Sequence, residues 1–155
     1  MLKYLWLSFA VIVADQATKT IILNWLDLYQ TVPVMPFFNL TLAYNTGAAF
    51  SFLASAGGWQ RWFFVILAAV IVTVLTVWLS RLAKTAKLEA ISLALIIGGA
   101  VGNVVDRLMH GHVIDFLDVY VGTNHWPAFN IADSAICVGA VLLIIDSFRK
   151  PAEKA

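Results

Sequence analysis

The chain has 155 residues, of which 61% are hydrophobic and 12% charged, and its formal net charge is +1. A water-soluble domain is typically about half apolar and a quarter charged, so this composition indicates an integral membrane protein. The net charge by itself says nothing about nucleic acid, but no cluster of lysine and arginine forms a stripe that could bind phosphates. The length suits one domain, and the single cysteine, Cys137, excludes a disulfide within the chain.

Four segments are apolar enough to cross a membrane, which takes roughly 20 residues each. We expect an all-α membrane fold of one domain, with four transmembrane helices at about 4–26, 62–79, 88–105 and 131–148. The first span begins like a signal peptide but is followed by no small-residue cleavage site. We therefore expect it to be retained as the first helix.

The distribution of lysine and arginine predicts the orientation, because cytoplasmic segments of membrane proteins carry the excess of positive charge. One side holds seven cations, Lys3, Arg81, Lys84, Lys87, Arg149, Lys150 and Lys154, and the other holds two, Arg61 and Arg107. We expect both termini and the 80–87 loop to be cytoplasmic. The segments 27–61 and 106–130 should lie outside the cytoplasm.

The outer segment 27–61 is too long for a simple turn. Polar and apolar residues alternate from Asn39 to Leu42, which predicts a short strand within 39–44. The apolar stretch 48–56 predicts a short helix that lies flat on the membrane surface.

Charged residues inside the spans are the first candidates for function. A charge at the centre of a membrane helix costs about 2.5–3.5 kcal/mol, and such residues usually face a protein interior or a wet cavity. Asp15 and Lys19 are four residues apart, so they share one face of the first helix and can pair. Both a structural ion pair and a direct role at the site stay open for them.

A polar corner is predicted at the outer end of the third span. Asn103, Asp106 and Arg107 occupy positions i, i+3 and i+4 of that helix. A helix-end cap with a local Asp–Arg pair is the structural alternative. Just before them, Gly98 and Gly102 have the small-residue spacing that permits close contact between membrane helices.

Two further aspartates lie near the outer membrane boundary. Asp115 has apolar neighbours, Ile114 and Phe116, which predict partial burial and a raised pKa of its carboxyl group. Asp133 lies near the first turn of the fourth helix, where the helix dipole favours the ionised form. As an alternative, Asp133 or Ser134 suits the N-cap of that helix. Two such carboxylates side by side would share a proton, as an aspartic protease requires.

The remaining acidic residues, Asp27, Glu89, Asp118 and Asp146, fall at expected interfaces, where we predict solvated side chains. The same residue types also serve three other chemistries. A zinc site from His110, His112, Asp115 and His125 lacks the helical spacing of metal ligands, and a serine protease lacks the G-x-S-x-G turn. A small channel or transporter remains the alternative, but it predicts acidic residues along a path across the whole membrane.

Five short stretches, at 15–19, 45–50, 98–107, 113–116 and 129–134, carry a specific resemblance. In this order, they resemble the bacterial lipoprotein signal peptidases, the signal peptidase II family. The resemblance implies four helices in the inner membrane, with a small extracytoplasmic β-cradle and a short surface helix. It implies an aspartic endopeptidase that removes signal peptides from diacylglyceryl-modified prolipoproteins, cutting just before the lipidated cysteine.

The resemblance also implies roles for individual residues. Asp115 and Asp133 match the catalytic pair, and Asp15 and Lys19 match polar positions of a structural kind. Six residues match the polar support around the site: Asn45, Gly47, Asn103, Asp106, Arg107 and Asn130. The expected partners are lipid-modified prolipoprotein signal peptides and membrane lipids. No cofactor, metal or nucleic acid is expected.

Overall fold

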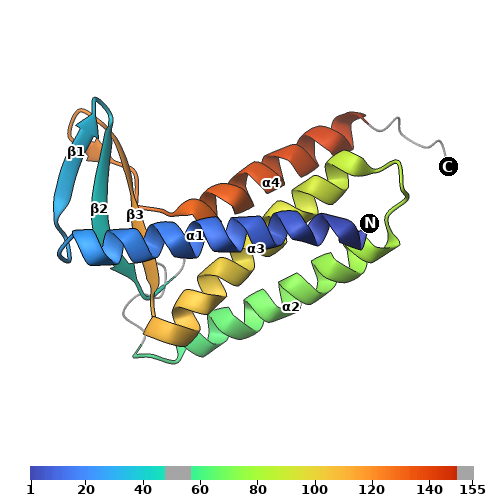
Figure 1. The fold of residues 1–155 in the computed structure, drawn as a ribbon, viewed down its shortest axis with the longest axis horizontal. Helices are drawn as coiled ribbons and strands as arrows, with labels where there is room; N and C mark the ends of the chain where they lie inside the picture. Colours follow the sequence, from blue (N-terminus) through green and yellow to red (C-terminus); the bar gives the residue numbers. More distant parts are fainter. Residues whose placement is uncertain (48–56, 150–155) are drawn as a thin grey trace.

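The computed structural model describes residues 1–47 and 57–149. Its four long helices are α1 (Leu5–Trp25), α2 (Gln60–Arg81), α3 (Lys87–His110) and α4 (Ile131–Arg149), and a short 3-10 helix, η1 (Leu2–Tyr4), precedes α1. All four long helices are of sufficient length and hydropathy to cross a membrane (Figure 1). The prediction of four apolar helices is thus confirmed.

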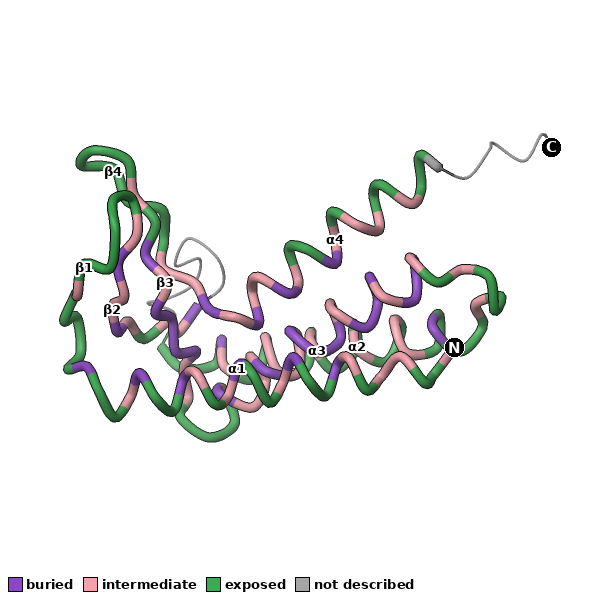
Figure 2. The backbone as a smooth tube through the Cα atoms, turned by 45° about the horizontal axis from the view of Figure 1, so that its top comes forward, coloured by how far each residue is buried: buried purple, intermediate pink, exposed green. Residues whose placement is uncertain are grey.

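Helix α3 is the centre of the bundle, since it contacts each of the other three long helices. Figure 2 shows buried residues along most of its length. Glycines allow this close packing. A Cβ atom at Gly98 would lie 2.8 Å from the Ser8 carbonyl oxygen on α1, and one at Gly99 would collide with the Ala132 carbonyl on α4. The close contact predicted at Gly98 and Gly102 is confirmed, since a Cβ atom at Gly102 would likewise lie 2.7 Å from Asp15 Oδ2 on α1.

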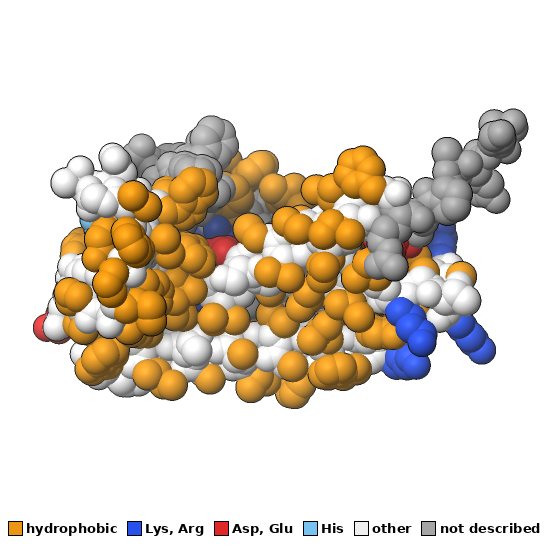
Figure 3. Space-filling model, turned by 90° about the horizontal axis from the view of Figure 1, so that it is seen from above, with side chains coloured by type: hydrophobic (Ala, Val, Ile, Leu, Met, Phe, Trp, Pro, Cys, Tyr) orange, Lys and Arg blue, Asp and Glu red, His pale blue; other side chains and the backbone are white. Residues whose placement is uncertain are grey.

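The outer surface of the bundle is apolar. On α2, only Gln60 and Leu79 are buried, while its large side chains, such as Trp62, Ile66 and Val70, are exposed. Hydrophobic side chains likewise cover the face shown in Figure 3. Apolar surfaces of this extent are stable in lipid and not in water. The chain therefore has the character of a multi-pass membrane protein.

A four-stranded antiparallel sheet stands at one end of the helices (Figure 1). Its strands β1 (Thr31–Met35), β2 (Phe38–Asn45), β3 (Val113–Val121) and β4 (Asn124–His125) lie in sequence order. The strand predicted within 39–44 is confirmed as β2. Strand β1 is an edge strand, which is where a sheet tolerates a proline such as Pro33.

The outer segment 106–130 differs from the prediction in two ways. Helix α3 continues to His110, beyond the expected end of the span at about 105, and it ends at Gly111 in the left-handed conformation that favours glycine. Strand β3 was not predicted, because Val113–Phe116 are all buried and give no alternation of polar and apolar residues. The predicted surface helix at 48–56 lies outside the described residues.

An apolar cluster fixes the sheet to the helices. Ile22 and Leu26, at the end of α1, pack against Leu42 of β2 and against Ile114 and Phe116 of β3. This packing holds Asp115, which lies between Ile114 and Phe116, at the junction between the sheet and the bundle.

Candidate active site

Asp115 and Asp133 line one cavity of about 750 Å³. Asp115 comes from β3, at the junction of sheet and bundle, and Asp133 from the first turn of α4. The other lining residues come from β2, α3, β3, the 126–129 segment and α4: Ala43, Tyr44, Asn45, Asn103, Arg107, Val113, Trp126, Pro127, Ala128, Phe129, Ser134, Ile136, Cys137 and Val138. The fold thus brings together two carboxylates that are separated by 18 positions in sequence.

Asp115 is buried and is held by two amide donors. Its strand partner is Ala43, so Asn45, two residues further along β2, faces the same side of the sheet. The Asn45 Nδ2 group donates to Asp115 Oδ2 at 3.2 Å, and Asn130 Nδ2 donates to Oδ1 at 2.7 Å. Burial, followed by the charge of Asp133, raises the pKa of Asp115 to about 7 despite these two hydrogen bonds.

Asp133 does not cap α4, so that structural alternative is wrong. The capping side chain is Asn130, whose Oδ1 accepts the Asp133 backbone N–H at 2.9 Å, while its carbonyl accepts the Ser134 N–H. The Asp133 carboxyl group is therefore available to the cavity. Its Oδ1 accepts a hydrogen bond from Asn103 Nδ2 at 2.7 Å.

Two asparagines link the carboxylates. The fully buried Asn130 contacts Asp115 directly and also donates to Asn103 Oδ1 at 3.2 Å, while Asn103 in turn holds Asp133. Asn103 and Asn130, predicted as support residues, thus form a continuous amide bridge between the two aspartates.

Asp106 and Arg107 face different groups. Asp106 forms its ion pair with Lys19, at 2.7 Å, and not with the neighbouring Arg107 as the structural alternative expected. Arg107 Nη2 donates to the Gly47 carbonyl at 2.8 Å, and its guanidinium lies over the Phe64 ring. Arg107 thereby ties the end of β2 to α3, while Asp106 belongs to a buried network behind the cavity.

That buried network begins on α1. Lys19 is 1% exposed and contacts Asp15 at 2.7 Å, Asp106 at 2.7 Å and the Asn103 side-chain oxygen at 3.2 Å. Gln16, which the sequence did not single out, donates to Asp106 Oδ1 at 2.8 Å. Its place between Asp15 and Lys19 at membrane depth was the signal that could have identified it. The predicted Asp15–Lys19 pair therefore reaches the site through Asn103.

A family model described as signal peptidase (SPase) II matches residues 7–149. This chain belongs to the signal peptidase II family. It is 53% identical over 154 residues to a lipoprotein signal peptidase of Alteromonas mediterranea, covering 99% of this chain and 85% of the relative. It is 56% identical over 153 residues to the lipoprotein signal peptidase of Photorhabdus laumondii, covering 99% and 92%. The resemblance found in the sequence is thereby confirmed, and the chain is an aspartic peptidase.

Solved structures agree with this assignment. The chain superposes on a bacterial membrane enzyme determined by the in meso method at 2.3 Å resolution with a TM-score of 0.85 and 31% identity, covering all of this chain and 95% of the other. A second such structure, at 1.9 Å resolution, gives a TM-score of 0.84 over 97% and 96% of the two chains, again at 31% identity. The four helices and the small sheet are thus those of a membrane enzyme.

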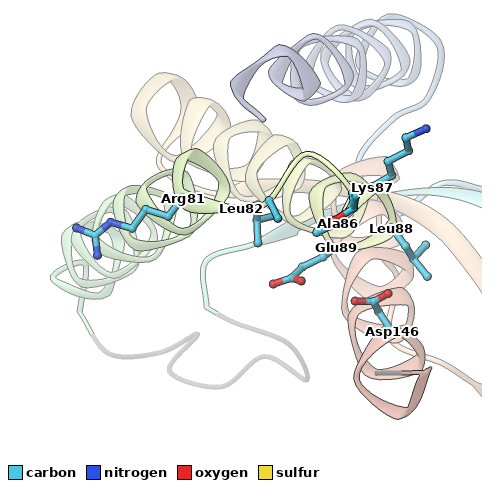
Figure 4. Close-up of a pocket in the computed structure, with 9 residues that line it drawn as sticks. Arg81, Leu82, Ala86, Lys87, Leu88, Glu89 and Asp146 are labelled. Carbon is cyan, nitrogen blue, oxygen red and sulfur yellow. The ribbon is translucent and has the colours of Figure 1, made fainter. Parts of the chain in front are cut away.

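This chain has a second cavity, of about 650 Å³, at the end of the bundle away from the sheet. Glu89 and Asp146 point into it, while Arg81 and Lys87 point away (Figure 4). The prediction of a solvated Glu89 is wrong: it is 5% exposed and accepts a hydrogen bond from Trp78 Nε1 at 2.8 Å. Sequence could not show this, because the indole comes from α2.

Asp118 was also expected to be solvated, and this too is wrong. It is buried on β3, accepts a hydrogen bond from Asn39 Nδ2 at 2.7 Å and contacts His125 Nδ1 at 2.8 Å. His112 instead stacks on the Tyr44 ring. Within residues 1–47 and 57–149, no three His, Cys, Asp or Glu side chains lie together as a metal site requires.

Proposed function

We propose that this peptidase removes signal peptides from diacylglyceryl-modified prolipoproteins, cutting just before the lipidated cysteine, with Asp115 and Asp133 as its catalytic pair. The observation that carries the proposal is the single cavity in which these two carboxylates are linked by Asn130 and Asn103. Relatives at 53–56% identity carry the name lipoprotein signal peptidase, which supports the substrate class.

The two aspartates differ in a way that suits general acid–base catalysis. A pKa of about 7 leaves roughly half of the Asp115 side chains protonated at neutral pH, and the dipole at the N-terminus of α4 stabilises a carboxylate at Asp133. Asp133 takes a proton from water, whose oxygen attacks the scissile carbonyl carbon, while Asp115 donates its proton to the carbonyl oxygen. This gives a tetrahedral intermediate with two hydroxyl groups on the former carbonyl carbon. When its C–N bond breaks, Asp133 returns its proton to the leaving amine, and Asp115 regains a proton from one of these hydroxyl groups.

The cavity suits a substrate that arrives from the bilayer. Cys137 and Val138 on α4 line the cavity and are also exposed on the apolar surface of the bundle. This wall connects the site with the lipid phase, so a signal peptide can enter between helices while its diacylglycerol stays in the membrane. Asn45, on β2, is placed to bond the substrate backbone.

The charges support an orientation in the bacterial inner membrane. Lys3, Arg81, Lys84 and Lys87 are exposed, and lysine and arginine side chains gather at the end of the bundle opposite to the sheet (Figure 3). This end is cytoplasmic in our proposal, with both termini, and the sheet and the aspartates lie near the extracytoplasmic face. In a Cys137→Ser background, Tyr29→Cys should react with an impermeant maleimide in spheroplasts, and Lys84→Cys only after lysis. The reverse labelling would contradict the orientation.

The substrate is tested with the purified protein in lipid nanodiscs. A prolipoprotein bearing a diacylglyceryl cysteine should yield, by mass spectrometry, a product that begins at that cysteine. The same precursor without lipid serves as the control and should be cut far more slowly. Equal cleavage of both precursors would contradict the lipid requirement, and no cleavage of either would contradict the function.

A channel or transporter, the alternative that the sequence left open, would need charged residues along a path across the whole membrane, whereas the buried ones other than Glu89 gather at the sheet end. It predicts a substrate-independent flux of protons or ions in sealed vesicles and no peptide product. Measurement of both outputs on one preparation separates the two functions.

A further inference from the structure

The buried ammonium group of Lys19 has an acceptor for each of its three N–H groups. Two are carboxylate oxygens, Asp15 Oδ2 and Asp106 Oδ2, each at 2.7 Å, and the third is Asn103 Oδ1 at 3.2 Å. The lysine side chain is 2% exposed, and the side chains of Asp15 and Asp106 are 0% and 1% exposed. One cation on α1 thus bridges carboxylates of α1 and α3.

Each of these two carboxylates also holds the backbone beside one catalytic aspartate. Asp15 Oδ1 accepts the N–H of Ala132, the residue before Asp133, at 2.9 Å. Asp106 Oδ2 accepts the N–H of Ile114, the residue before Asp115, at 3.0 Å. The two arms are equivalent: a carboxylate bonded to Lys19 binds the amide that immediately precedes a catalytic carboxylate.

The packing around this bridge is close. A Cβ atom at Gly102 would lie 2.7 Å from Asp15 Oδ2, so the glycine allows the carboxylate to approach α3. The third acceptor, Asn103, is the residue that donates to Asp133 Oδ1 at 2.7 Å. Because Asn103 Oδ1 faces the ammonium, its NH₂ group is turned toward Asp133.

We propose that Lys19 is a positioning residue that sets the spacing and orientation of the catalytic pair through Asp15, Asp106 and Asn103. The inference rests on the proposed function of Asp115 and Asp133 and adds a role for a lysine to which the family resemblance gave a structural role. Lys19 does not line the cavity that holds the two aspartates. It acts by fixing the backbone before each aspartate and the amide that binds one of them.

The positive charge of Lys19 has a second, measurable consequence. The other charged groups around Asp115 and Asp133 are Asp106 and Arg107 on α3 and Asp15 on α1. The charge of Lys19 lowers the pKa of Asp115, whereas burial and Asp133 raise it. Replacement of the ammonium by a neutral group should therefore move the titration of Asp115 to higher pH.

The decisive experiment compares two variants of the full-length protein. Lys19→Met leaves Asp15 and Asp106 buried without their cation and is expected to lower thermal stability. The triple variant Lys19→Met, Asp15→Asn, Asp106→Asn removes all three charges but retains side-chain oxygens that can accept the two backbone N–H groups. We expect it to recover most of the thermal stability.

The kinetics of the triple variant distinguish positioning from simple charge neutralisation. If Lys19 sets the geometry, kcat for lipidated precursor should stay about 10²-fold below wild type, the scale of a displacement of about 1 Å at reacting groups, while KM changes little. A triple variant with wild-type stability and wild-type kcat would overturn the inference. Cleavage by the wild-type enzyme in the same assay shows that the proposed function itself holds.

A readout independent of activity completes the test. Infrared spectroscopy should detect, in the wild-type protein, a carboxyl group that titrates near pH 7 and disappears in Asp115→Asn. In Lys19→Met, the midpoint of this titration should move upward, which loss of packing alone would not produce. An unchanged midpoint in a folded Lys19→Met protein would contradict an electrostatic effect of Lys19 on Asp115.

Discussion

The two ends of the helix bundle each contain a cavity into which two carboxylates point, and their surroundings differ. At the sheet end, Asp115 and Asp133 accept hydrogen bonds from asparagine amides, with the buried Lys19 behind them. At the other end, Glu89 accepts a hydrogen bond from an indole N–H, and the nearby cations point away from the cavity (Figure 4).

This difference shows what a catalytic pair needs beyond two nearby acids. Two carboxylates act as acid and base only when one stays protonated and both keep a fixed geometry. The amide bridge and the lysine network supply that geometry at the sheet end. The lining of the opposite cavity comes from helix ends and the exposed loop after α2, where the side chains of Arg81 and Lys87 are exposed.

The largest expected effect separates the two pairs. Asp115→Asn and Asp133→Asn should each lower the cleavage rate of lipidated precursor by at least about 10³-fold, because each removes one proton-transfer group. Glu89→Gln, which can still accept from the Trp78 indole, and Asp146→Asn are the matched controls and should cleave at the wild-type rate. Initial rates in nanodiscs measure all four variants. A wild-type rate in either variant of the first pair would contradict the assignment.

Hydropathy predicted the helices well, because a span must be apolar whatever it packs against. Strand β3 escaped prediction because its first half is buried on both faces, so its sequence does not alternate there. Glu89 and Asp118 were misread as solvated, since their partners, Trp78 and His125, come from other elements. Sequence identified the polar residues but not which carboxylate each amide would contact.

The site residues show the same limit. The pairing of Asp15 with Lys19 follows from helical spacing, whereas the pairing of Asp106 with Lys19 depends on how α1 packs on α3. Likewise, Asn130 could be recognised by family resemblance, but its double role as helix cap and aspartate ligand needed the structure. Contacts within one helix are therefore predictable from spacing, and contacts between elements are not.

The second prediction tests the amide bridge. Asn130→Ala removes both the cap of α4 and the donor to Asp115, so it should lower kcat by about 10²-fold through misplacement of the pair and lower stability by about 1 kcal/mol through loss of the cap. Asn24→Ala, at an exposed position on α1, is the control with the same chemical change and should leave kcat unaltered. A normal kcat in Asn130→Ala would show that the bridge is dispensable.

The third prediction compares glycines at the two ends of the α3–α4 contact. A Cβ atom at Gly99 would collide with the Ala132 carbonyl, and one at Gly139 would lie 2.7 Å from the Ser92 carbonyl. Each change to alanine should lower the free energy of unfolding by about 1–3 kcal/mol, measured by thermal denaturation in detergent. Gly99→Ala should also lower kcat of the folded fraction, since Ala132 precedes Asp133. A similar loss of kcat in folded Gly139→Ala would show that the site responds to any repacking of these helices.

The smallest effect is the pH dependence of the wild-type enzyme. Asp115 must be protonated to donate to the carbonyl oxygen, and this form is present below its pKa of about 7 and lost as the pH rises through that value. The cleavage rate should therefore fall by about tenfold per pH unit on the alkaline side. Asp146→Asn should show the same profile as the wild type, whereas Lys19→Met should retain activity to higher pH. A wild-type rate that stays constant from pH 6 to 9 would mean that Asp115 is not the proton donor, and that the sheet-end pair works with its roles exchanged.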